Sequence, residues 1–197
     1  MWLASIPGRE LFIKELLSPL ILAVIIVTIV PFIAYYFYMK RTGATDRRAA
    51  RARLGLVIAI LTIMVVVGIN YYTFKPGTTY GLELSDGKLV FHYYENRVAT
   101  YNVCKATIKL IDVDTAKHML KIRTYGTSDP TVGIYAGEYI LTNNSRAHVL
   151  IVPGASRAII IEEKGVASAI IGVPNAGEAY NRIVSYREAH CNSIGGG

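Results

Sequence analysis

Two carboxylates and an imidazole form the tightest group of metal-ligand types in the chain. Asp112, Asp114 and His118 lie within seven residues of one another, and oxygen and imidazole donors could together hold a divalent cation. A metal-dependent enzyme is the chemistry that such a group would support. The plainer interpretation is a solvated loop between two strands, and we favour it. We therefore predict no metal and no cofactor.

Other catalytic signatures are missing from the sequence. It has no P-loop, no dinucleotide-binding glycine pattern, no H-E-x-x-H, no C-x-x-C and no nucleophile elbow. His92 and His148 fall inside apolar runs, and we interpret them as packed or edge histidines instead of bases. The chain is predicted not to be an enzyme, and no catalytic residue is assigned.

The two cysteines, Cys104 and Cys191, offer redox chemistry. Outside the cytoplasm an even number of cysteines favours a disulfide. Such a bond would tie the end of the last helix to the β-rich region, and chain entropy gives it about 4–5 kcal/mol. Two unrelated free thiols are the alternative.

A third candidate is a modification site. Asn143, Asn144 and Ser145 match the N-glycosylation sequon, with Asn143 as the acceptor. The same three residues also make an ordinary turn, so the match has meaning only if this part of the chain lies outside the cytoplasm.

Composition and hydropathy indicate which secondary-structure elements the chain forms. Of 197 residues, 52% are hydrophobic and 18% charged, with a mean hydropathy of +0.35, whereas soluble domains carry about 25% charged residues. The ranges 16–39 and 54–74 contain no charged side chain. As helices they would span about 36 and 31 Å, against a hydrocarbon core of about 30 Å. We predict two transmembrane helices.

The segment 40–53 between these helices sets the predicted topology. Its six basic side chains face one acidic side chain, Asp46, and both outer flanks are poorer in positive charge. The positive-inside rule then places this basic loop in the cytoplasm and both termini outside the cell membrane. Binding of anionic headgroups is a second interpretation of the same side chains: Lys40, Arg41, Arg47, Arg48, Arg51 and Arg53. Because the basic excess is concentrated in this quarter of the chain, we expect no nucleic-acid partner.

The two ends of the chain are short. Residues 1–15 mix apolar and charged side chains, which predicts an interfacial segment or an ordered lead-in to the first span. Residues 192–197 form a Gly-rich tail.

The range 75–191 has the patterning of a β-domain. Turn residues such as Asp86-Gly87 separate its β-rich runs and predict seven or eight short antiparallel strands. Asn175 and Glu178 open one closing helix that extends to about His190. The runs are 80–84, 89–94, 97–101, 106–112, 119–125, 133–141, 148–152, 157–162 and 166–173.

Strands followed by one C-terminal helix resemble the pleckstrin-homology-like (PH-like) superfold. Residues 78–188 are similar in detail to the PH-like domains of bacterial and archaeal membrane proteins. The similarity lies in YGLELSDGKLV, in the glycines of RTYGTSDPTVGIYAGEYIL, in AIII before EKG, and in PNAGEAYNRIV. It implies an antiparallel β-barrel of about seven strands with a capping helix, no catalytic residues and a prokaryotic source, and the style of the sequence is compatible with an archaeal one. This chain departs from the family in one respect: many relatives are expected in the cytoplasm, whereas the loop charges here place the domain outside.

The functional expectation is a non-enzymatic membrane-anchored scaffold or accessory subunit of a larger membrane complex. It would act through protein–protein contacts of an extracytoplasmic PH-like domain, and aromatic side chains would anchor the interface. A ligand- or lipid-headgroup-binding module and a self-assembling homo-oligomeric scaffold are the alternatives. The candidate interface aromatics are Tyr93, Tyr94, Tyr125, Tyr135 and Tyr139.

Overall fold

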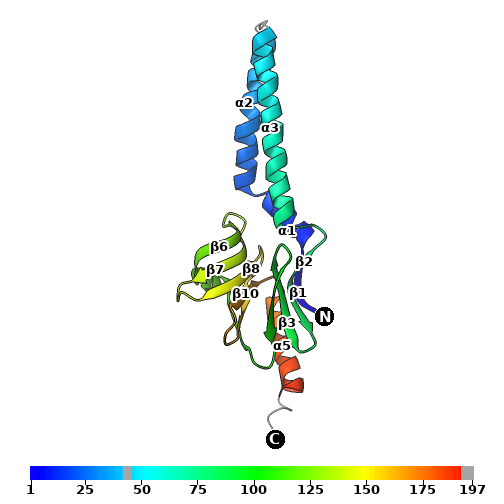
Figure 1. The fold of residues 1–197 in the computed structure, drawn as a ribbon, viewed down its shortest axis with the longest axis vertical. Coiled ribbons are helices and arrows are strands. Elements are labelled where there is room, and N and C mark those ends of the chain that lie inside the picture. The colour runs from blue at the N-terminus through cyan, green and yellow to red at the C-terminus, as the bar shows by residue number, and fades with distance from the viewer. Residues whose placement is uncertain (42–45, 192–197) are drawn as a thin grey trace.

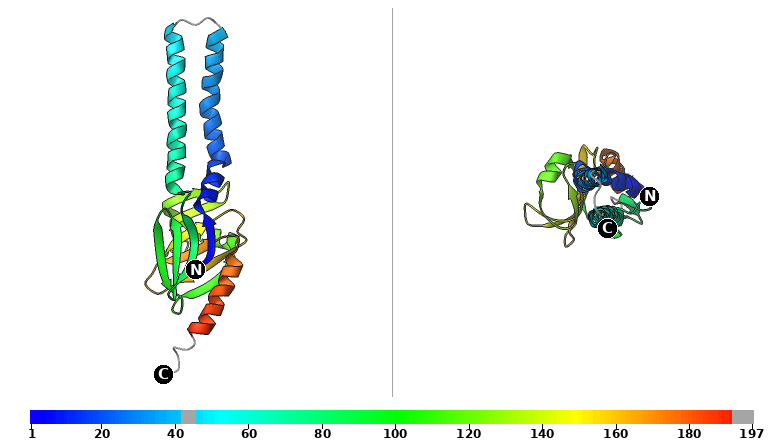
Figure 2. Two further views of the ribbon diagram at one scale, coloured as in Figure 1. Left: turned by 90° about the vertical axis from the view of Figure 1, so that its right-hand side faces the viewer. Right: turned by 90° about the horizontal axis from the view of Figure 1, so that it is seen from above.

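The computed structural model describes residues 1–41 and 46–191 and consists of a long helical hairpin with a β-rich domain at one end (Figure 1). The N-terminus and Cys191, the last described residue, both belong to the domain end of the hairpin (Figure 2). The predicted Gly-rich tail, 192–197, and residues 42–45 of the basic loop lie outside the described residues.

The hairpin consists of α2 (Pro19–Arg41) and α3 (Asp46–Thr73). The ranges Ile21–Arg41 and Arg53–Thr73 are long and apolar enough to cross a membrane, with mean hydropathies of 2.3 and 2.4. The two long apolar helices expected from the sequence are thus present. The basic segment differs from the expectation, because α3 begins at Asp46 and already includes Arg51 and Arg53. Alanine and arginine have high helix propensity, so the helix already begins before the apolar run.

Close packing joins the two helices. Gly55 of α3 is buried against α2, and a Cβ at that position would lie 2.4 Å from the Phe32 ring. Ala59, one turn further along, is also buried. Small residues four apart let the two backbones approach each other.

The first sixteen residues belong to the β-domain, which corrects the expected interfacial segment over residues 1–15. β1 (Trp2–Pro7) pairs antiparallel with β2 (Thr79–Ser85), and α1 (Gly8–Leu16) leads into the hairpin. Leu3, Ala4 and Ile6 are buried. The hairpin is therefore inserted between two neighbouring strands of one sheet.

The first sheet has the order β1-β2-β3-β4, with β3 at Lys88–Tyr94 and β4 at Arg97–Asn102. All of its pairs are antiparallel. Asp86 and Gly87 both have positive φ in the turn between β2 and β3, as an Asp-Gly hairpin requires.

The second sheet has the order β5-β9-β10-β8-β7-β6. The pair β8–β10 is parallel, and β5 and β6 are free edges. Two open sheets therefore replace the expected closed antiparallel barrel. The bounds are β5 Thr107–Asp112, β6 Leu120–Asp129, β7 Ile134–Leu141, β8 Arg146–Ile151, β9 Arg157–Glu162 and β10 Ser168–Gly172.

Both faces of the central strands β8, β9 and β10 are buried. Their inner face packs on the first sheet through residues such as Leu150 and Ile161. Their outer face, with Val149 and Ile160, is covered by the short helix α4 (Val113–His118). The predicted closing helix is present as α5 (Ala176–His190), although the Asn175 side chain makes no capping hydrogen bond.

Candidate interaction surface and the polar residues around it

The candidate metal cluster is accounted for by α4. Asp112 is the N-cap residue of this helix, and its Oδ1 accepts a hydrogen bond from the Asp114 backbone N–H at 2.8 Å. The Asp114 carboxylate pairs with Lys117 at 2.9 Å, which lowers its pKa. His118 is exposed at the other end of the helix. Within residues 1–41 and 46–191 no group of three acidic, His or Cys side chains could hold a metal ion.

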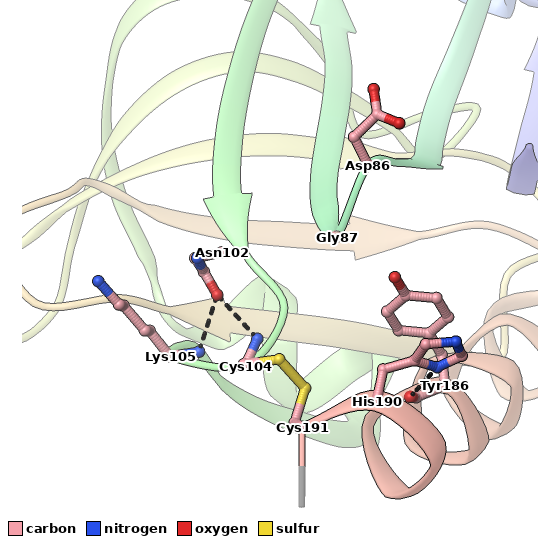
Figure 3. A pocket seen from close by; sticks show the side chains of 8 residues that line it. All are labelled: Asp86, Gly87, Asn102, Cys104, Lys105, Tyr186, His190 and Cys191. Carbon is pink, nitrogen blue, oxygen red and sulfur yellow. Dashed lines mark hydrogen bonds between the residues drawn. A yellow bond between two sulfur atoms is a disulfide. The ribbon is translucent and has the colours of Figure 1, made fainter. Parts of the chain in front are cut away.

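Cys104 and Cys191 are joined by a disulfide in the structure, with their Cα atoms 5.4 Å apart (Figure 3). Cys104 lies in the turn after β4, and Cys191 directly follows α5. The Asn102 Oδ1 accepts hydrogen bonds from the backbone N–H groups of Cys104 and Lys105, at 3.0 and 3.2 Å. The bond therefore joins the end of α5 to an ordered turn.

A hollow of about 560 Å³ lies beside this disulfide. Figure 3 shows the Tyr186 and His190 rings together on one side of it, and these rings are stacked with centroids 4.2 Å apart. Asp86 and Lys105 also line the hollow. Its walls come from the β2–β3 turn, the β4–β5 turn and α5, so it marks where these three segments meet.

The candidate interface tyrosines divide into buried and accessible residues. Tyr93, Tyr94 and Tyr139 are only 3%, 7% and 4% exposed, which corrects their expected role as surface anchors. They occupy inward positions where large rings fill the core. Tyr135 is half-buried, and Tyr125 is 37% exposed.

Tyr125 is the centre of a surface where β6, at the edge of the second sheet, meets the turn between β3 and β4. The Arg97 guanidinium lies 4.0 Å from the centroid of the Tyr125 ring, a cation–π distance. The Tyr125 hydroxyl bonds the Glu95 carboxylate at 3.0 Å. We call Glu95, Arg97 and Tyr125 the Tyr125 surface. Tyrosine and arginine are the residue types most enriched at the energetic centres of protein interfaces.

A polar cluster joins the two sheets behind the Tyr125 surface. The Glu138 Oε1 on β7 accepts a hydrogen bond from Arg97 at 2.7 Å and one from the Tyr93 hydroxyl at 3.3 Å. The Tyr93 ring stacks on His148 of β8, with centroids 4.5 Å apart. Burial raises the pKa of Tyr93 to about 12 and lowers the pKa of His148. Tyr93 and His148 are therefore both neutral near pH 7.

A pocket of about 320 Å³ adjoins this cluster. Its lining includes Thr124 of β6, Glu138 of β7 and Arg146 and His148 of β8. The buried Nδ1 of His148 has no hydrogen-bond partner within the described residues. The pocket combines a carboxylate, an imidazole and a guanidinium, and Glu138 links it to Arg97 of the Tyr125 surface.

Sequence reasoning did not single out Glu138 or Arg97. The signal was present in the alternation of β7, because Ala136, Glu138 and Ile140 share one face. Ala136 faces the core, so the Glu138 carboxylate on the same face of β7 needs a hydrogen-bonding or charged partner. Arg97, on a strand of the other sheet, supplies it.

A second buried polar group lies where the domain meets the hairpin. Glu15, in the last turn of α1, is 6% exposed and its Oε1 accepts a hydrogen bond from the Thr127 hydroxyl at 2.8 Å. Burial raises the pKa of Glu15. Asp129 is equally buried, but hydrogen bonds from Thr131 and Ser18 outweigh its burial and lower its pKa.

We compared the chain with models of protein families, with curated proteins and with solved structures. None of them matched. The functional argument therefore rests on the residues and contacts described above.

Proposed function

We propose that this chain is a non-enzymatic, membrane-anchored scaffold or accessory subunit of a membrane complex. Its extracytoplasmic domain binds a partner protein through the Tyr125 surface and the pocket beside it. The observation that carries this proposal is the combination of an accessible Tyr–Arg pair with an adjoining pocket. Hot-spot residues beside a pocket are typical of protein interfaces.

The way the domain is attached to the hairpin supports a scaffold. The chain enters the first helix from β1 and α1 and returns from the second helix into β2, the neighbour of β1. The Gly8 backbone N–H also bonds the Thr78 carbonyl at 2.7 Å across this junction. Two connections and a buried contact hold the domain in one orientation, so a docked partner takes a defined place above the bilayer.

The proposed topology places the domain and both termini outside the cell and the basic segment in the cytoplasm. The basic residues from Lys40 to Arg53 lie at the end of the hairpin farthest from the domain. A disulfide in the domain agrees with this orientation, because disulfides persist in oxidising compartments.

A PH-like ancestry remains part of the proposal. Its support is an antiparallel sheet followed along the chain by further strands and one closing helix, α5, against the sandwich. The six-stranded sheet and its parallel pair are additions to the simple barrel of that family.

The interaction surface is tested by Tyr125→Ala in the full chain. Loss of an aromatic hot spot weakens an interface by about 2 kcal/mol or more, about 30-fold, so we expect the partner to dissociate during size-exclusion chromatography of detergent-solubilised complexes. Thr100→Ala is the matched control, since Thr100 is exposed on β4, where Arg97 also lies. A complex that keeps its mass and composition in Tyr125→Ala would overturn this assignment of the surface.

A further inference from the structure

The single N-x-Ser/Thr sequon of the sequence lies on a tight turn. Asn143 begins the sequon and falls between β7, which ends at Leu141, and β8, which starts at Arg146. Asn143 and Asn144 are both exposed. A sequon can be used only where a transferase can reach the asparagine side chain, and the tip of a surface turn satisfies this condition.

The turn presents the acceptor amide to solvent. The Asn143 Oδ1 accepts hydrogen bonds from the backbone N–H and the hydroxyl of Ser145, at 3.0 and 2.7 Å. These bonds use the oxygen of the amide and fix its plane, while the amide nitrogen makes no hydrogen bond to the part of the chain that the structure describes. The nitrogen that would be modified is thus accessible.

The turn between β7 and β8 also lies away from the helical hairpin formed by α2 and α3. Thr127, near the other end of the β6–β7 hairpin, bonds Glu15 at the base of the membrane helices. Thr127 pairs with Ala136 of β7, and β7 then runs five residues further to Leu141, about 16 Å at about 3.3 Å per step. Headgroups at the hairpin base would therefore not cover Asn143.

The disulfide supplies an independent indication of compartment. Cys104–Cys191 lies in the same domain as the sequon, and protein N-glycosylation is likewise confined to extracytoplasmic segments. A glycan on Asn143 and the proposed function both require that the domain lies outside the cytoplasm.

We propose that Asn143 carries an N-linked glycan. In the transfer, the Asn143 amide nitrogen forms a bond to the anomeric carbon of a lipid-linked oligosaccharide. The bond between that carbon and the lipid phosphate breaks, the phosphate leaves with the electron pair, and the amide proton passes to a base of the transferase. No oxidation or reduction takes place.

Peptide mass spectrometry of the full chain, purified from membranes of its source cells, tests this inference. Trypsin releases residues 124–146 as one peptide, because no Lys or Arg lies between Arg123 and Arg146. We expect this peptide to carry a glycan mass that is lost in Ser145→Ala and retained in Ser145→Thr. Asn144→Gly is the matched control, because Asn144 has a φ of 64° that glycine adopts freely, and it preserves the sequon.

Two results would overturn the inference, and they differ in what else they affect. An unmodified peptide in a chain whose Cys104 and Cys191 are bonded would reject the glycan and leave the topology standing. An unmodified peptide together with two free thiols would reject both the glycan and the extracytoplasmic position of the domain.

Discussion

At the scale of single residues, two carboxylates near the base of the hairpin have pKa values shifted in opposite directions. Glu15 receives one hydrogen bond and its Oε2 is buried without a partner in the described structure, so burial dominates and its pKa is raised. Asp129 as a whole residue is equally buried, but its carboxylate accepts hydrogen bonds from Thr131 and Ser18, and its pKa is lowered. Desolvation is the largest effect on Glu15, and the Asp129 charge adds to it, whereas several donors outweigh a shallower burial of the Asp129 carboxylate.

This difference predicts the pH dependence of a Glu15→Gln variant. A carboxyl with a raised pKa contributes stability in acid, and that contribution is lost as the pH rises through the raised value. Glutamine removes the buried negative charge; an unpaired buried group costs about 1–3 kcal/mol and more when it is charged, and each 1 kcal/mol moves Tm by about 2–4 °C. We expect Glu15→Gln to melt above the wild type at pH 8, with a difference that shrinks as the pH falls.

Thermal unfolding of the detergent-solubilised chain between pH 4 and pH 8 measures this effect. Glu10→Gln is the control, because Glu10 is exposed on α1 and pairs with Lys14 at 2.7 Å. A Tm difference for Glu15→Gln that is the same at every pH would contradict the role assigned to burial.

At the scale of elements, α5 is attached to the sandwich at both ends. Ala176, Ala179 and Ile183 pack into the core near its start, and the disulfide fixes Cys191 just after its end. The bond closes a loop with a sequence separation of 87 residues, so its main effect is to restrict the unfolded chain.

Replacing both cysteines by serine, Cys104→Ser with Cys191→Ser, should therefore lower the free energy of unfolding by about 3–5 kcal/mol. Urea unfolding can be followed by the fluorescence of the one tryptophan, Trp2, which lies on β1 against His92 with ring centroids 5.0 Å apart. Ser185→Ala, at an exposed position of α5, serves as the control. Equal urea midpoints for the wild type and the double variant would show that the disulfide does not stabilise the domain.

Most elements could be predicted from the sequence, because their signals are local. Every β-rich run between residues 80 and 173 forms a strand, and both apolar runs form long helices. β1 was missed because its six residues resemble an amphipathic lead-in until they pair with β2, more than 70 positions away. The same limit applies to the polar cluster, since Glu138 and Arg97 lie on different sheets.

At the scale of the whole molecule, the domain is discontinuous in sequence and the apolar helical hairpin is an insertion within it. The order β5-β9-β10-β8-β7-β6 depends on crossovers that no local pattern encodes, which is why a closed barrel was expected and two open sheets were found. This arrangement gives the domain two covalent connections to the helical hairpin and leaves the Tyr125 surface beside the turn between β3 and β4. A domain held in this way suits the presentation of a binding surface.

The most direct test of this account is the mass and composition of the native particle. The chain is isolated from its source membranes in mild detergent, the complex is weighed, and each co-purifying protein is identified. We predict a particle much heavier than one 21.7 kDa chain, with other subunits in fixed ratio. A particle that contains one copy of this chain and no other protein would contradict the proposed scaffold.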